Sequence, residues 1–417
     1  MRVVHLVQGY SPAIGGTESV IQRLSEHLVA DHNDSVTVIT TAAMSGGAFV
    51  GLDPRRLPVG IEAINGVRVY RQPFFAGHAA ISGLLQRAAY RFRLPLNDVL
   101  RTIWQGPVSP GMLRRVLTCE ADVIAASSFP LLHMWYALWA GEVKRRPVVL
   151  IGGLHPDDQW GFDRGCIIQA IKQADAYVAY TTYERDYLIG KGISPSAITV
   201  IGAGVDPEPF LKADGAEIRW RFGWGDSPVV AFVGQHAEHK GIDTLISAMA
   251  LVWQERPDTR LLIAGASTPF TPRLESLISA LGPDVRTRVA FLTNIPEIEK
   301  AQVLAACDIF AHPSRYESFG IAFLEAWAAG KPVIGCRAGA TPFVIADRRD
   351  GILVAPGSEA ELAKAIVHLA GDAALRRRLG ENGRAKVLAN FTWSEVSREF
   401  HDLYARVVAR SGKRSTA

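Results

Sequence analysis

The feature that most constrains the fold of this chain is a regular alternation of short β-branched runs with longer runs of helical period. The chain opens with RVVHLV, continues with a helical pattern over residues 17–30, and then reaches a second short run, SVTVIT. In the helical part, apolar residues recur every three or four positions, as at Val20, Leu24 and Leu28. This order predicts a β-α-β unit with two parallel strands.

Two series of such units follow each other along the chain. Strand-like runs of the first series end at AITVIG, and a second series opens at PVVAFVG. The segment between them begins with GAGVDPEPF and is interrupted by Gly, Pro and Asp, which is typical of a linker. We therefore expect an α/β protein of two doubly wound, parallel-sheet, Rossmann-like domains, residues 1–203 and 204–393, with an interdomain cleft. Functional residues should follow the carboxyl ends of strands.

The composition excludes several other classes of protein. Hydrophobic residues make up 48% and charged residues 21% of the chain, as in globular proteins with a large core. The net charge of +4 is too small to indicate nucleic-acid binding unless it is concentrated on one face. The four cysteines form no C-x-x-C motif, so we expect reduced thiols. Since no run of 18 apolar residues occurs and the first apolar run is too short for a signal peptide, we expect a cytoplasmic protein.

Two adjacent glycines stand directly before the first predicted helix. Gly15 and Gly16 follow the first strand in the segment QGYSPAIGGTES. They lack side chains and lie beside the positive end of a helix, so a phosphate or a sugar could approach the backbone there. The spacing is not G-x-G-x-x-G, which removes the main support for a dehydrogenase. The competing interpretation is a glycine pair that only shapes a turn.

The densest group of candidate residues lies in SRYESFGIAFLEAWAAGKPVIG, in the second half of the chain. Glu317 precedes a predicted helix over residues 319–329, and Glu325 lies about 10 Å further along its axis. Amides at the helix start could hold a phosphate, while the two carboxylates could hold hydroxyl groups on either side of it. Lys240 also follows a strand and precedes a helix, where an ammonium can meet a phosphate. Two glutamates at this spacing are also common without any function.

Taken together, these segments resemble the retaining GT-B glycosyltransferases commonly called family 4. The family shares an E-x7-E motif, here Glu317 to Glu325, followed by a Gly-Lys-Pro-Val entry into a strand. The Gly-Gly loop, a histidine after an interior strand (His155), the Gly-Val-Asp linker and the Lys240-Gly turn occur in the family's order. The resemblance covers nearly the whole chain. It implies a GT-B architecture with an acceptor-binding N-terminal domain, a nucleotide-sugar-binding C-terminal domain, and a terminal helix, residues 394–410, that returns to the first domain.

The resemblance also implies a role for each motif residue. His155 would lie near the reacting sugar, Glu317 would hold sugar hydroxyls and Lys240 would hold the pyrophosphate; these three are the predicted catalytic residues. Glu325 would bind the ribose hydroxyls. The other predicted donor contacts are the glycine pair, one polar residue after a strand and the start of the predicted helix: Gly15, Gly16, Gln235, Phe319, Gly320, Ile321 and Ala322.

Two positions depart from the family pattern. Gln235 stands where the family usually has Arg, and Phe343 stands where it usually has Glu. A neutral amide stabilises a departing diphosphate less than a guanidinium does, so another cation such as Arg315 or Lys331 would have to replace it. No D-x-D triplet occurs. We therefore expect no metal and no other cofactor, since the nucleotide-sugar is a substrate.

The acceptor side is less clearly marked. Residues 74–118 combine apolar residues at near-helical spacing, such as Ile81, Leu84 and Phe92, with several arginines. Such a segment is typical of a helix packed on its own domain, and it also fits peripheral contact with an anionic membrane. Trp160, close to His155 in the chain, is the predicted residue for stacking on an acceptor sugar.

These observations predict a retaining, metal-independent hexosyltransferase of glycan or glycoconjugate biosynthesis. It would move a sugar from a UDP- or GDP-sugar to a hydroxyl acceptor, which is a glycan, a lipid-linked molecule or a small molecule. No side-chain nucleophile is assigned, because the family is thought to use front-face displacement. Two alternatives stay open: a noncatalytic nucleotide-sugar-binding subunit, and a sugar-nucleotide epimerase of the same architecture.

Overall fold

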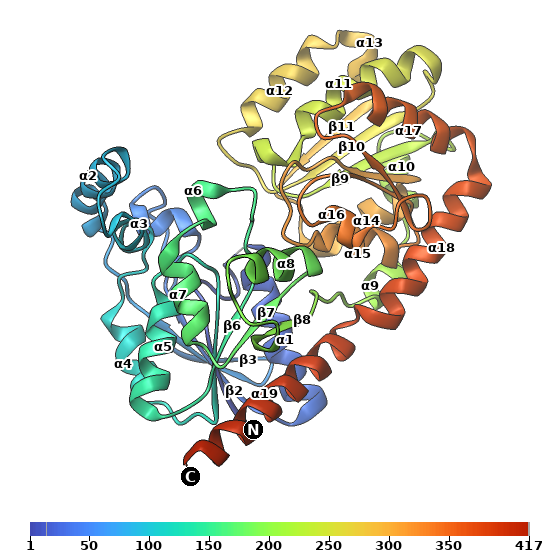
Figure 1. The fold of residues 1–417 in the computed structure, drawn as a ribbon. Coiled ribbons are helices and arrows are strands. Elements are labelled where there is room, and N and C mark those ends of the chain that lie inside the picture. The colour runs from blue at the N-terminus through green and yellow to red at the C-terminus, as the bar shows by residue number, and fades with distance from the viewer. Residues whose placement is uncertain (14, 416–417) are drawn as a thin grey trace. The chain divides into compact units, whose positions relative to one another are not determined.

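The computed structural model describes residues 1–13 and 15–415, and it divides into two compact units (Figure 1). The first unit contains residues up to Ala203 together with the segment from Trp393 onward. The second unit contains Gly204–Thr392. Each unit is an α/β fold built around its own sheet, so the predicted fold of two doubly wound domains is confirmed.

The first unit is built on an eight-stranded sheet with the order β3-β4-β2-β1-β5-β6-β7-β8. All neighbouring strands are parallel except β3 and β4, which pair antiparallel. The chain enters at β1 and extends the sheet first on one side and then, from β5, on the other, so the strand order switches between β1 and β5. The strands are β1 (Arg2–Leu6), β2 (Ser35–Thr41), β3 (Gly60–Ile64), β4 (Val67–Gln72), β5 (Val123–Ser127), β6 (Val148–Ile151), β7 (Ala176–Ala179) and β8 (Ile198–Val200).

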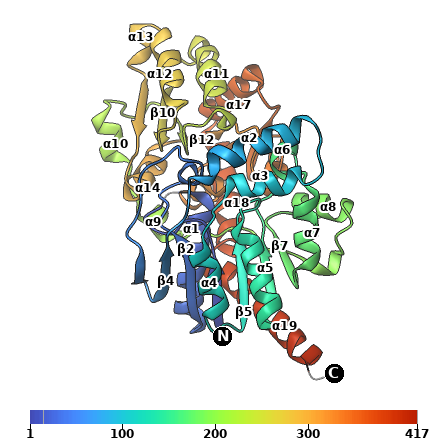
Figure 2. The ribbon, with the colours of Figure 1, turned by 90° about the vertical axis from the view of Figure 1, so that its left-hand side faces the viewer.

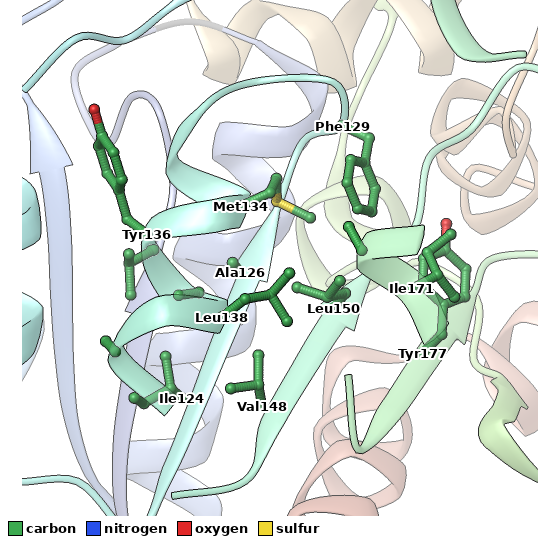
Figure 3. Close-up of a cluster of buried hydrophobic side chains, with 14 of the residues drawn as sticks. Ile124, Ala126, Phe129, Met134, Tyr136, Leu138, Val148, Leu150, Ile171 and Tyr177 are labelled. Atoms are coloured by element: carbon green, nitrogen blue, oxygen red, sulfur yellow. The ribbon is translucent and has the colours of Figure 1, made fainter. Parts of the chain in front are cut away.

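The core of the first unit explains why β6 and β7 are apolar on both faces. Figure 3 shows Ile124 of β5, Leu150 of β6 and Tyr177 of β7 meeting Leu138 of α5 and Ile171 of α7, all of them buried. Strands covered on both faces are apolar along their whole length, as in a parallel sheet. The helices of this unit are α1 (Gly16–His32), η1 (Gly46–Val50), α2 (His78–Arg91), α3 (Asn97–Gln105), α4 (Pro110–Thr118), α5 (His133–Lys144), α6 (Gln159–Phe162), α7 (Gly165–Gln173), α8 (Thr182–Gly190), η2 (Pro195–Ala197) and α19 (Trp393–Ser415).

The second unit contains a six-stranded, fully parallel sheet with the order β11-β10-β9-β12-β13-β14. The chain enters this sheet at β9 and adds β10 and β11 on one side. It then adds β12, β13 and β14 on the other side, so the strand order switches between β9 and β12. The strands are β9 (Val229–Val233), β10 (Arg260–Gly265), β11 (Val289–Thr293), β12 (Ile309–His312), β13 (Val333–Cys336) and β14 (Gly351–Val354). The helices are α9 (Glu208–Lys212), α10 (Ala216–Arg221), η3 (Glu238–Lys240), α11 (Ile242–Glu255), α12 (Thr271–Ala280), α13 (Pro283–Arg286), α14 (Glu297–Ala306), α15 (Ile321–Ala328), α16 (Thr341–Val344), α17 (Glu359–Gly371) and α18 (Ala373–Asn390).

The terminal helix α19 belongs to the first unit, where it packs on α1. It begins at Trp393, which is buried, and the hydroxyl of its Tyr404 lies 3.0 Å from Nε2 of His5 in β1. Phe400 is fully buried in the same interface. Neither this helix nor any other in the described residues combines the length and apolar character that a membrane crossing requires.

Candidate functional site

The second unit brings two predicted site residues together at its switch point. β9 and β12 are neighbours in the sheet, and the chain leaves them toward opposite sides of the strand order. Lys240 lies in the segment after β9, and Glu317 lies in the segment after β12. Both segments therefore start at the carboxyl ends of the strands, where open α/β sheets bind their ligands.

A glycine fixes the position of Lys240. The short turn η3 ends at Lys240, and Gly241 follows it with a φ of 70°. A Cβ atom at Gly241 would lie 2.2 Å from the carbonyl oxygen of Pro313, so a larger residue would displace the segment after β12. The Lys-Gly turn is thus held against the segment that carries Glu317.

Lys240 and Glu317 form a largely buried ion pair. Nζ of Lys240 donates to Oε1 of Glu317 at 2.5 Å, and the two side chains are 19% and 8% exposed. Nδ1 of His312, at the end of β12, lies 3.7 Å from the same oxygen. Burial lowers the pKa of His312 to about 4 against the opposing effect of Glu317, so this imidazole is neutral at pH 7. Lys240 thus supplies the positive charge beside Glu317, and such a pair can open to offer an ammonium to a phosphate and a carboxylate to hydroxyl groups.

The helix that follows Glu317 starts later than the sequence predicts. Gly320 has a φ of 94°, which ends the turn, and α15 begins at Ile321 and ends at Ala328, within the predicted range of 319–329. The amides of Ile321 and Ala322 lie in the first helical turn, where an α-helix has no acceptor of its own for them. The ring of Phe319 is 4% exposed and packs on Phe391, so this residue reaches a ligand through its backbone only.

The second glutamate of the motif has a partner that the sequence did not suggest. Oε1 of Glu325 accepts a hydrogen bond from Nζ of Lys300 on α14 at 2.5 Å, and Lys300 also contacts Glu297 at 2.5 Å. Burial raises the pKa of Glu325, while Lys300 lowers it. The side chains of Glu325 and Lys300 are only 12% and 18% exposed. A ribose held by Glu325 would therefore share that carboxylate with Lys300.

The two cations that could replace the missing arginine lie at opposite ends of the sheet. Gln235 is exposed in the segment after β9. Lys331 immediately precedes Pro332 and β13, at the amino end of the strands, and cannot reach the site. Arg315 follows β12 at the carboxyl end, with its guanidinium half-exposed and 3.5 Å from Asp243. Of these two cations, Arg315 alone lies at the carboxyl ends of the strands, where Lys240 and Glu317 also lie.

In the first unit, the predicted glycine loop already holds a carboxylate. Gly15 caps α1, and a Cβ atom at this position would lie 2.1 Å from Oε2 of Glu18. Oε1 of Glu18 accepts a hydrogen bond from Nε2 of Gln8 at 2.9 Å, and burial raises the pKa of this carboxyl. A carboxylate at the positive end of α1 competes with a phosphate for the same place. Gly16, by contrast, is open, with nothing within 4 Å of an added Cβ atom.

His155 lies in the segment after β6, which a buried glutamate holds in place. Oε1 of Glu184 accepts hydrogen bonds from the amides of Gly153 and Leu154 at 3.2 and 3.1 Å, and from the hydroxyl of Tyr177 at 2.5 Å. Glu184 is 1% exposed. The ring of His155 is half-buried, 5.3 Å from that of Phe162. The carboxylate of Glu184 in α8 thus holds the backbone segment that leads from β6 to His155.

Trp160 is fixed by two buried arginines. Its carbonyl oxygen accepts hydrogen bonds from Arg101 at 2.6 Å and from Arg164 at 3.3 Å. The guanidinium carbons of both lie over its ring, at 5.6 and 5.4 Å from the centroid. The ring of Trp104 meets it edge-on at 6.4 Å. Trp160 as a whole residue is 37% exposed, and the two guanidinium groups already lie over its ring.

The structure therefore groups the predicted residues by unit. Lys240, Glu317 and the start of α15 form one cluster, whereas the carboxylate of Glu325 contacts α14. Sequence reasoning missed Lys300 and Glu184, because each acts across elements that are distant in the chain and neither lies in a motif. Within the part of the chain that the structure describes, no group of three or more His, Cys, Asp or Glu side chains is placed to hold a metal ion.

Two family models match this chain. The model described as "Glycosyl transferases group 1" matches residues 214–386, and the model described as "Glycosyltransferase Family 4" matches residues 14–209. The first covers the ion pair and α15, and the second covers the glycine loop, His155 and Trp160.

Individual relatives agree with these models. The chain is 34% identical over 412 residues to D-inositol 3-phosphate glycosyltransferase of Corynebacterium glutamicum strain R, a match that covers 96% of this chain and 87% of the relative. It is 33% identical over 262 residues to the protein of the same name from Stackebrandtia nassauensis, which covers 60% of this chain and only 58% of that relative. Among solved structures, the Anabaena protein HepE in complex with UDP and glucose is similar with a TM-score of 0.74 at 21% identity, over 97% of this chain and all of that chain.

Proposed function

Because the chain belongs to Glycosyltransferase Family 4, we propose that it is a hexosyltransferase that moves a sugar from a UDP- or GDP-sugar to a hydroxyl acceptor. Its two-unit fold is the GT-B architecture, as predicted. The observation that carries the proposal is the Lys240–Glu317 ion pair at the switch point of the second unit, beside the start of α15. The relatives named above are glycosyltransferases, and the HepE structure holds UDP and glucose, which supports a nucleotide-sugar donor.

In this proposal the donor opens the ion pair. The ammonium of Lys240 turns to the diphosphate, the carboxylate of Glu317 accepts hydrogen bonds from sugar hydroxyls, and the amides of Ile321 and Ala322 complete the phosphate site. Glu325 accepts from the ribose, with Lys300 beside it. Gln235 donates a neutral hydrogen bond, and Arg315 adds charge from the same edge.

The chemical step needs stabilisation of a leaving diphosphate rather than a protein nucleophile. As the bond from the anomeric carbon to the phosphate oxygen breaks, negative charge builds on the diphosphate, and Lys240 and the helix amides oppose it. The acceptor hydroxyl attacks from the same face, and its proton passes to the departing phosphate, so the sugar keeps its anomeric configuration. His155 and Trp160 position the sugar and the acceptor. No metal is required in this proposal, because Lys240 and the helix start take the place of a cation.

The proposal places the chain in the cytoplasm, in glycan or glycoconjugate biosynthesis, and it includes a lipid-linked molecule among the acceptors.

A ligand screen tests the donor assignment most directly. Thermal unfolding of the full chain is followed with UDP, GDP, ADP and their sugars, because a specific ligand at 100 times its Kd stabilises by about 2.7 kcal/mol. We expect a shift with UDP or GDP compounds and none with ADP compounds. If no nucleotide raises the unfolding temperature, the donor assignment is wrong.

One rival is favoured by a specific observation. Gln235 and the exposed Phe343 replace two residues that the family usually keeps charged, which fits a subunit that binds nucleotide-sugars without transferring them. Donor turnover separates the two, using nucleotide-sugars with a labelled sugar and following donor hydrolysis and transfer. Binding without release of nucleotide across the whole donor panel would favour the rival.

A further inference from the structure

The helix α2 turns its large apolar side chains outward. Ile81, Leu84 and Leu85 are 69%, 66% and 52% exposed. The residues that face the protein are small or polar: Ser82, Gly83, Gln86 and Ala89. An ordinary surface helix buries its apolar face. α2 therefore faces the opposite way from a surface helix that packs its apolar side on its own domain.

Close packing holds α2 in this orientation. The helix packs mainly on α3 and the short η1, and both views show α2 and α3 side by side (Figure 2). A Cβ atom at Gly83 would lie 3.1 Å from Nε1 of Trp104, so the glycine lets α2 approach α3 closely. Ser82 donates to the carbonyl oxygen of His78 at 2.7 Å. Small residues rather than apolar burial thus fix the inner face.

The turn after α2 continues the apolar surface. Phe92, Leu94 and Leu96 are 69%, 47% and 71% exposed, and Leu96 has a φ of 66°. Turns at a surface usually carry Gly, Asn, Asp or Ser. We call the outer side of residues 81–96 the α2 face.

The charges on the α2 face have one sign. Arg87, Arg91 and Arg93 are exposed, and in the described residues no carboxylate lies within ion-pair distance of them. Asp98 is the only acidic residue between Glu62 and Glu120 in the chain, and it is held by Arg101 at 2.6 Å. Exposed apolar side chains interspersed with exposed arginines match a lipid interface, where the acyl region takes the apolar side chains and anionic headgroups take the arginines.

From these observations we infer that the α2 face binds peripherally to the surface of an anionic lipid bilayer. A second copy of this chain fits the face less well, because a symmetric contact would place the arginines of one copy against those of the other. The inference does not depend on sugar transfer, since it concerns the first unit and a partner that binds without a donor.

The binding surface connects directly to the predicted acceptor side. The guanidinium of Arg101 lies between the rings of Tyr90 on α2 and Trp160 on α6, at 5.0 and 5.6 Å from their centroids. A chain bound through the α2 face would thus hold Trp160 near the bilayer surface. Together with the proposed function, this favours an acceptor carried by a lipid.

Vesicle flotation of the full chain without donor tests the inference. We expect binding to phosphatidylcholine vesicles that contain phosphatidylglycerol, weaker binding at high salt, and no binding to pure phosphatidylcholine. The double variant Arg91→Gln with Arg93→Gln should bind about 30-fold more weakly, from about 1 kcal/mol for each arginine near the surface. Phe92→Ser with Leu96→Ser should lose at least about 10-fold.

The matched control is Val143→Ser on α5, where the original side chain is 72% exposed outside the α2 face. It should bind like the unaltered chain, and all variants should keep the same melting temperature. Unchanged binding in both double variants, or equal binding to neutral and anionic vesicles, overturns the inference. A dimer in light scattering that Phe92→Ser with Leu96→Ser abolishes, without vesicle binding, would instead assign the face to a second copy. Nucleotide-induced thermal shifts measured on the same variants show separately whether the donor proposal holds.

Discussion

At the scale of single residues, the ion pair between Lys240 and Glu317 combines two tasks in one contact. With no ligand, each side chain satisfies the other in a site where an unpaired charge would be costly. In the proposed function, a bound diphosphate would give the ammonium a stronger partner, and the carboxylate would then be free to accept hydrogen bonds from the sugar. His312, whose Nδ1 lies 3.7 Å from Oε1 of Glu317, is neutral and adds no competing charge.

This arrangement predicts the effect of Lys240→Met. Removing the ammonium deletes a charge-assisted contact to the diphosphate, worth about 1.5–3 kcal/mol, so UDP or GDP should bind about 10- to 150-fold more weakly. Titration calorimetry with the nucleotide measures this change. Lys212→Met is the matched control, because Lys212 forms an exposed ion pair with Glu208 in the same unit. Equal nucleotide affinity in the two variants would contradict the role of Lys240.

Glu184 illustrates a second kind of residue, one that acts through the backbone of another segment. Its two oxygens accept from Gly153, Leu154, Tyr177 and the amide of Tyr180, so every partner is a donor. A carboxylate matches this set, whereas an amide NH2 would face another donor. We therefore consider Glu184 a positioning residue for the segment of His155.

In the variant Glu184→Gln, we expect the first unit to lose about 2 kcal/mol of unfolding free energy, because one buried donor is left without an acceptor. Transfer should slow while UDP affinity stays constant, since the phosphate contacts of Lys240 and α15 lie in the second unit. Chemical unfolding, calorimetry and kcat are the three measurements. Glu142→Gln, an exposed change in the same unit, serves as control. A variant with normal kcat would show that the His155 segment does not need this anchor.

At the scale of elements, the start of α15 depends on one glycine. Gly320 has a φ of 94°, and a Cβ atom there would lie 2.5 Å from the ring of Phe323. Two costs are therefore combined at this position, backbone strain and a steric clash at the point where the helix amides should meet a phosphate.

Two glycine variants separate these costs. Gly282→Ala introduces a side chain at a φ of 86° with nothing within 4 Å, so it reports strain alone, about 1 kcal/mol. Gly320→Ala should cost about 1–3 kcal/mol more, and it should also weaken nucleotide binding, which Gly282→Ala leaves unchanged. Unfolding of the second unit and nucleotide calorimetry provide the comparison. Equal losses in both variants would show that the contact with Phe323 is relieved at little cost.

The element α2 shows the limit of periodicity. Its apolar stripe is plain in the sequence, but periodicity does not say whether the stripe faces the protein or the solvent. The packing of Gly83 on Trp104 decides this, and both residues would be unremarkable in isolation.

At the scale of the whole molecule, buried neutral histidines link stability to pH. Burial lowers the pKa of His5 to about 3, and of His133 and His312 to about 4. In the unfolded chain these groups titrate near pH 6.5. Their contribution is therefore fully present above about pH 6.5 and is lost as the pH falls toward 4, because only the unfolded chain takes up the protons.

As the pH falls from about 6.5 toward 4, we expect each of these histidines to lower the unfolding free energy by about 1.4 kcal/mol per pH unit. Denaturant unfolding at several pH values between 7.5 and 4.5 measures the slope. His5→Gln should reduce the slope for the first unit by that amount, whereas His312→Gln should reduce the slope for the second unit and leave that of the first unchanged. If the slope of His5→Gln equals that of the unaltered chain, His5 is protonated in the folded state.

The sequence by itself determined the fold class and the family, because these depend on local periodicity and on motifs whose residues are close in the chain. The segment expected to be a linker contains two helices in the structure, α9 and α10. The family resemblance and the two-domain fold are confirmed, and the site roles of His155, Lys240, Glu317 and Trp160 stay predictions. The strand order places Lys240 beside Glu317, although 77 positions separate the two residues in the chain.

Only the tertiary structure decided the partners of the motif residues. It placed Lys300 on Glu325, Glu18 in the glycine loop, Glu184 under the His155 segment and Lys331 at the wrong edge of the sheet. It also turned the apolar stripe of α2 outward. The physical reason is the same in each case: contacts between elements distant in the chain depend on packing and strand order, which leave no periodic signal in the amino-acid sequence.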